Sequence, residues 1–176
     1  MRRERQAGFD DLIASLVVTH FLVLVLAGLI GAVAGLRALT APAVVAWAAM
    51  LHWINLDGTW VQWLGHPITV AVLTVLALGE LITDQLPKTP SRTVPVQFIT
   101  RLITGGFAGA ALGTAWGYRW GGLGAGLIGA AVGTIAGYEM RRRLSDHHGV
   151  DLPVALSEDV VAVLGGLAVV ALTAAL

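Results

Sequence analysis

Long apolar runs separated by short polar segments make up the chain. The runs cover residues 12–36, 38–56, 67–86, 102–117, 121–140 and 152–176. A helix crosses the hydrocarbon core of a bilayer with about 20 apolar residues. A segment in lipid must be helical, because no water is present to bond an open backbone. The pattern therefore predicts an all-α, polytopic bundle of transmembrane helices, folded as a single membrane domain over residues 1–176.

Composition supports the same class of protein. Of the 176 residues, 56% are hydrophobic and 12% are charged, whereas soluble domains carry about 25% charged residues. The absence of cysteine excludes disulfides, thiolate metal sites and a cysteine nucleophile. A formal net charge of zero gives no indication of nucleic-acid binding. The first apolar run is longer than the roughly 7–15 residues of a signal-peptide core, so we expect a retained helix.

The placement of basic residues predicts the topology. Three arginines in the tail 1–11 place the N-terminus in the cytoplasm by the positive-inside rule. The segment 38–56 is short, with Pro42 near its start, so we expect it to be re-entrant or half-spanning. Five crossings then remain, the C-terminus is external, and only Arg37 and Arg119 of the basic residues face outward. Six full crossings are the alternative. The loop 87–101 joins an N-terminal half, 12–86, to a C-terminal half, 102–176.

Glycines recur at helical spacing in the C-terminal half. Residues 109–118 read GAALGTAWGY and residues 129–138 read GAAVGTIAGY. Glycines four residues apart lie on one helix face and let two helix backbones approach closely. We therefore expect a glycine-zipper helical hairpin, with a glycine-lined pore or sliding surface as the alternative. The expected packing residues are Gly105, Gly109, Gly113, Gly117, Gly129, Gly133 and Gly137.

Ionisable residues occur inside the apolar runs, where each costs about 2.5–3.5 kcal/mol on insertion scales. Glu80 and Asp84 share a helix face near the end of one run, and Glu158 and Asp159 lie near the start of the last run. These ends share one side of the membrane, so we expect the four carboxylates to converge near Arg101. Arg37 is expected to enter from the opposite side.

Three interpretations of this charge cluster remain open. The residues could form structural ion pairs, a proton or cation site, or an anion site built on Arg37 and Arg101. At the cytoplasmic surface, Arg141, Arg142 and Arg143 could contact anionic lipid headgroups. His147 and His148 are weak candidates for a metal site. No phosphate-binding glycine loop or catalytic motif is present, so we expect neither a cofactor nor an enzyme.

Three motifs together resemble a known family. They are AGLRALTAPAVVAWA at 34–48, GELITDQLPKTPSRT at 79–93 and GYEMRRRLSDHHGVDLPVALSEDVVAVLGG at 137–166, with the glycine hairpin between the last two. The chain resembles, from about residue 32 onward, the bacterial membrane family called domain of unknown function forty-one twenty-six. This resemblance implies a polytopic membrane protein and brings no established activity.

The sequence thus predicts a small protein of the bacterial inner membrane with three possible roles. The first is translocation of a small solute or ion, coupled to protons or not, through the acidic cluster. The second is a structural or scaffold role in which the glycine hairpin docks a partner helix. The third is a membrane-embedded enzyme that handles lipid. The expected partners are the lipid bilayer and further copies of the chain, and the sequence names no substrate.

Overall fold

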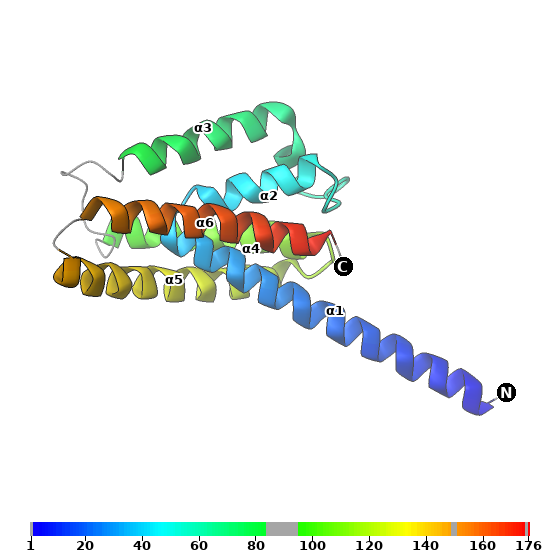
Figure 1. Cartoon of the computed structure of the whole chain (residues 1–176). Coiled ribbons are helices and arrows are strands. Elements are labelled where there is room, and N and C mark those ends of the chain that lie inside the picture. The colour runs from blue at the N-terminus through cyan, green and yellow to red at the C-terminus, as the bar shows by residue number, and fades with distance from the viewer. Residues whose placement is uncertain (1, 84–94, 149–150, 175) are drawn as a thin grey trace.

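The computed structural model describes residues 2–83, 95–148, 151–174 and 176, and these residues form an antiparallel helical bundle. Successive helices alternate in direction along the bundle (Figure 1). A 3₁₀ helix, η1, precedes α3. The bounds are α1 Arg2–Leu36, α2 Thr40–Met50, η1 Gln62–Gly65, α3 Pro67–Thr83, α4 Pro95–Thr114, α5 Arg119–His148 and α6 Asp151–Thr173.

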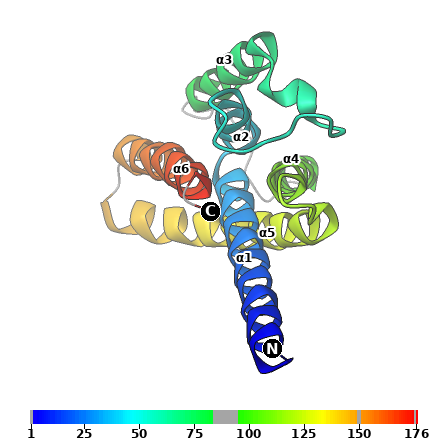
Figure 2. The same cartoon turned by 90° about the vertical axis from the view of Figure 1, so that its right-hand side faces the viewer.

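Helix α1 occupies the middle of the bundle. It packs against α4, α5 and α6, and α4 also packs against α5. Helix α2 lies over this group and contacts α3, α4 and α6, which leaves α3 on the outside (Figure 2). The N-terminal part of α1 extends beyond the other helices (Figure 1).

The segment 38–56 does not return to the level where it starts, so it is not re-entrant, whereas its 11-residue helix α2 is as short as a half-spanning segment. Helix α2 begins beside Arg101, which bonds the end of α1. The loop after α2 reaches Thr114 at the opposite end of α4, where the Trp60 indole nitrogen donates to the Thr114 hydroxyl at 3.1 Å. The two positions on α4 are about 20 Å apart at 1.5 Å per residue. The segment therefore starts inside the bundle and continues to its far end.

The positions of the two termini also differ from the five-crossing expectation. Both lie toward the end of the bundle that carries the α4–α5 turn (Figure 1). The His20 ring of α1 stacks on the Tyr118 ring of that turn, with 4.6 Å between the ring centroids. This part of α1 therefore lies beside the α4–α5 turn. Arg2–Arg5 and Arg141–Arg143 lie at opposite ends of the bundle, whereas the charge rule placed both groups on one side. The side of a membrane that each group faces stays a prediction.

Glycines lie where helix backbones approach most closely. A Cβ atom added to Gly109 would come within 3.0 Å of Gly122, and one added to Gly113 within 3.0 Å of Tyr118. On the other face of α5, a Cβ on Gly129 or Gly133 would meet α1 backbone equally closely. Helix α5 therefore uses its glycines against two different helices.

The remaining glycines on the predicted list have other surroundings. Gly105 belongs to the close contacts, because an added Cβ would lie 2.6 Å from the Ala130 side chain. Gly117 does not pack: it has a φ of +71° in the α4–α5 turn, with nothing within 4 Å of an added Cβ. A left-handed backbone after a helix end favours glycine. Gly137 is buried in α5.

The distribution of side chains differs from that of a typical water-soluble bundle, because charged and polar groups join the apolar core and many large apolar residues lie outside. The largest fully buried side chain is that of Arg37. Besides many alanines and valines, the interior contains Thr40, Arg101, Thr134 and Asp159. Large apolar residues are instead exposed along the outer faces of the helices, among them Ile68, Val75, Ile82, Ile103, Ile128, Ile135, Val161 and Leu164.

We predict that alanine at two glycines of α5 has opposite effects on stability. Gly129→Ala should lower the free energy of unfolding by about 1–3 kcal/mol, because the added methyl group would overlap α1 backbone. Gly124→Ala should leave it unchanged or raise it by up to about 1 kcal/mol, because its site is open and alanine favours helix. Denaturant titration of the purified protein measures both. Equal stability of the two variants would contradict the close α1–α5 contact.

Candidate functional site

The candidate site surrounds a break between two helices. Helix α1 ends at Leu36 and α2 begins at Thr40. The last carbonyls of one helix and the first amides of the next have no partner within their own helix. Leu39, at the N-cap position of α2, provides no side-chain hydrogen bond. Because buried backbone groups must be bonded, other helices have to supply the partners here.

Glu80 of α3 binds the start of α2. One carboxylate oxygen accepts a hydrogen bond from the Ala38 amide at 2.7 Å, and the other accepts one from the Leu39 amide at 2.7 Å. Both oxygens therefore bond backbone. The negative charge also lies at the positive end of the α2 dipole, which stabilises it.

Arg101 of α4 binds the end of α1. Its Nη1 donates to the carbonyl oxygens of Gly35 and Leu36, the latter at 2.8 Å. The Thr134 hydroxyl of α5 also lies 3.3 Å from the Gly35 oxygen. The side chain is buried, with 3% of its surface exposed. Its positive charge faces the negative end of the α1 dipole, so both ends of the break are matched in sign.

Between these two contacts, Arg37 forms a buried ion pair with Asp159 of α6. The Arg37 Nε donates to Asp159 Oδ1 at 2.6 Å, and Nη2 contacts the same oxygen. Arg37 is completely buried and Asp159 is 7% exposed. Charges this deep are tolerated when they are paired and hydrogen-bonded.

The four charged side chains lie inside the bundle and not at its end. Arg101 is in the second turn of α4, about 9 Å from its start, and Asp159 is about 12 Å along α6. Thr40, the first residue of α2, is also buried, and its hydroxyl has no hydrogen-bond partner among the residues that the structure describes. The arrangement is thus a polar centre built around a helix break, with side chains from α3, α4 and α6.

The structure brings together most of the described candidates and corrects one of them. Glu80, Arg101 and Asp159 meet at residues 35–39, as the shared helix ends suggested. Arg37 lies in the same cluster and does not enter from the opposite side, because it sits in the break itself. Asp84 and the side chain of Glu158 lie outside the described residues, so their part in the convergence stays a prediction.

Sequence reasoning missed the main partner of the charges, which is the backbone. Ion pairs, a proton or cation site and an anion site were the expectations, whereas Glu80 and Arg101 bond amides and carbonyls of residues 35–39. A signal was present: Arg37 interrupts two apolar runs and is followed by Pro42, which favours a helix start. The hydroxyl of Thr134 bonds the Gly35 carbonyl. The sequence marked this residue only as a polar position in an apolar run.

The other candidates lie away from this centre. Glu139 forms ion pairs with Arg142 at 3.2 Å and Arg143 at 2.8 Å on the exposed surface of α5. His147 and His148 end α5, and their side chains lie outside the described part of the chain. Among the described residues, no group of three His, Asp or Glu side chains is arranged to hold a metal ion.

We predict that breaking the buried ion pair is more harmful than removing it. Arg37→Met should cost about 3–5 kcal/mol of unfolding free energy, because it leaves Asp159 charged and buried without this partner. The double variant with Asp159→Leu should recover much of that loss, because no charge of the pair remains. Denaturant titration of wild type, both single variants and the double variant gives the coupling energy. A double variant as unstable as the summed single variants would contradict a direct pair.

Comparison with known proteins gives a family and no function. No curated protein and no solved structure matches the chain. The sequence matches the family described as Domain of unknown function (DUF4126) over residues 23–175. That range contains the helix break and all four charged residues around it. The match covers most of the chain, and the protein therefore belongs to the DUF4126 family.

Proposed function

We propose that this protein is a polytopic membrane protein that translocates a small solute or ion, with the α1–α2 break as its gate. The observation that carries the proposal is the break itself. A helix interrupted inside the bundle has both ends held by ionisable side chains of other helices. Discontinuous helices with polar groups near the membrane midplane are typical of small transporters.

The surface supports a location in the membrane. Two segments, Leu12–Leu36 and Arg119–Arg143, are long and apolar enough to cross a bilayer. The outer faces of α3, α5 and α6 also expose large apolar side chains, which a soluble monomer rarely does over such an area. Small residues at the helix contacts and polar groups inside follow the pattern of helices that associate in lipid. Lipid or further copies of the chain would cover the exposed faces.

Glu80 is the group whose protonation would alter the gate most. Its two oxygens hold the first amides of α2, so a neutral carboxyl group would bind that helix end less strongly. Helix α2 could then shift relative to α1 while Arg101 keeps its contact with α1. The buried Thr40 hydroxyl would offer a polar group to a solute at the opened break. Proton coupling would follow from this dependence of α2 on the charge of Glu80.

The scaffold alternative has less support from the glycines. Gly109 and Gly122 face each other, and Gly129 and Gly133 face α1, so these surfaces are already used within the chain. A partner helix would have to dock elsewhere. The charged cluster could still be purely structural, since every contact described above also stabilises the break. An embedded enzyme has the least support, because Arg101 and Glu80 are engaged with backbone.

We predict that Glu80→Gln slows proton flux into proteoliposomes by about tenfold, which corresponds to about 1.4 kcal/mol. Glutamine loosens the start of α2 but cannot take up and release the proton that the coupled cycle has to carry. A pH-sensitive dye inside the vesicles reports the flux under an imposed pH gradient, with potassium and valinomycin clamping the potential. Glu139→Gln is the matched control, because it changes the same group at the exposed surface of α5. Its flux should equal that of the wild type.

Two outcomes would contradict the proposal. Wild-type vesicles that are no more permeable than protein-free vesicles to protons, sodium, potassium or chloride would remove the case for ion translocation. A Glu80→Gln variant with lower stability and unchanged flux would show that the cluster only stabilises the fold.

Membrane topology provides a separate prediction. The chain has no cysteine, so single cysteines can be introduced at Gln6, Arg142 and Leu176, all exposed. Six crossings place positions 6 and 176 on the same side, and position 142 on the other. An impermeant thiol reagent applied to intact cells and to inverted vesicles should show this division. Labelling of positions 6 and 176 from opposite sides would instead indicate an odd number of crossings.

A further inference from the structure

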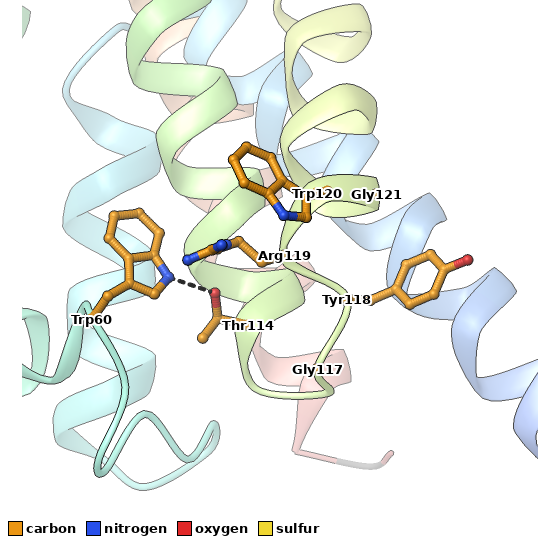
Figure 3. Close-up of a pocket in the computed structure, with 7 residues that line it drawn as sticks. All are labelled: Trp60, Thr114, Gly117, Tyr118, Arg119, Trp120 and Gly121. Atoms are coloured by element: carbon orange, nitrogen blue, oxygen red, sulfur yellow. Dashed lines mark hydrogen bonds between the residues drawn. The ribbon is translucent and has the colours of Figure 1, made fainter.

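A second site lies at the opposite end of the bundle from the helix break. An open pocket of about 580 Å³ is formed where the loop before η1 meets the α4–α5 turn. The side chains that could bind a ligand are those of Trp60, Arg119 and Trp120. The wall also includes Thr114, Gly117 and Gly121. Figure 3 shows the Arg119 side chain between the two indole rings.

The aromatic rings hold the guanidinium group in place. Its central carbon lies 4.6 Å from the Trp120 ring centroid and 5.9 Å from that of Trp60, which is within the range of cation–π attraction. Trp60 is itself fixed, because its indole nitrogen donates to the Thr114 hydroxyl. The Tyr118 ring points away from the pocket and stacks on His20. The cation is therefore positioned before any ligand arrives.

The charge of Arg119 is available to an anion. Within the described part of the chain, no carboxylate forms an ion pair with it, whereas Arg37, Arg142 and Arg143 all have such partners. Arginine presents several donors in a planar fork that matches phosphate oxygens. The pocket also opens at the first residues of α5, where the helix dipole adds positive potential.

An apolar stripe continues from the pocket along α5. Trp120, Ile128, Val132 and Ile135 are exposed on it. Gly124 lies between the first two, and an added Cβ there would meet nothing within 4 Å. A shallow apolar path with a cation at its head fits a molecule with a phosphate group and an acyl chain. Free phosphate would use the cation and leave the stripe unused.

We propose that the Arg119 pocket binds the phosphate of an anionic phospholipid, with one acyl chain lying along α5 over Gly124 and Ile128. The site requires a membrane location and is independent of translocation. Trp60 and Trp120 would flank the headgroup at the level of the membrane interface, where tryptophan is enriched. The lipid would thereby connect the loop before η1 with the α4–α5 turn.

Native mass spectrometry of the detergent-purified protein tests the site with phosphatidylglycerol as the probe. Arg119→Gln should weaken phosphatidylglycerol binding by about tenfold, the loss expected for one charged hydrogen-bonding group. Arg119→Lys, which keeps the positive charge but not the planar fork, should weaken this binding less than Arg119→Gln does. Gly124→Leu should weaken it too, because a leucine side chain would obstruct the acyl path without removing charge. Thermal unfolding in detergent alone should be equal for the wild type and all three variants.

Several results would overturn the assignment. Equal binding of phosphatidylglycerol by the wild type and Arg119→Gln would show that the pocket is not its site. Equal loss of binding in Arg119→Lys and Arg119→Gln would mean that the positive charge of this residue does not attract the lipid. Phosphatidylcholine bound as strongly as phosphatidylglycerol would remove the role of anionic charge. Binding of inorganic phosphate that depends on Arg119 but is unaffected by Gly124→Leu, without binding of the lipid, would assign the pocket to a free anion.

Discussion

The fold depends on hydrogen bonds to the free backbone groups at a helix break that lies inside the bundle. In an apolar interior, the free carbonyls of α1 and the free amides of α2 have no water to bond. Glu80 and Arg101 take the place of that water, and each has the charge that the adjoining helix dipole favours. Arg37, in the break, then requires the carboxylate of Asp159. One interruption in one helix thus accounts for three buried ionisable residues, Arg37, Arg101 and Asp159, and for the half-buried Glu80.

The second constraint is the close approach of α5 to α1 and α4. In the proposed membrane location, lipid would supply little hydrophobic force between helices, and packing would have to provide the association. Glycine at positions 109, 122, 129 and 133 allows backbone contact that any side chain would prevent. Small residues therefore occupy these helix contacts, while many large apolar residues lie on the outer surface.

The sequence predicted the features that depend on local pattern. Apolar runs gave the helices, and four-residue spacing located Gly109 and Gly129 at positions that approach other helices. It also selected Glu80, Arg101 and Asp159, because a charge in an apolar run needs a special partner. Features that depend on the path of the chain were not predicted. The course of 38–56 was inferred from its short length, from Pro42 and from the placement of the arginines. The last argument assumes that each arginine stays at the surface, whereas Arg37 and Arg101 are buried.

The two constraints divide the bundle into parts of different rigidity. Helix α5 contacts both α1 and α4 through backbone, where even one added methyl group would not fit, so these helices can move little against one another. Helix α2 contacts α3, α4 and α6, and its start is attached by hydrogen bonds to a carboxylate. A change of charge at Glu80 would therefore act on α2 before it acted on the glycine-packed helices. The break joins α1, which belongs to the rigid group, to α2, which can adjust. A gate at this position is therefore consistent with the packing of the helices.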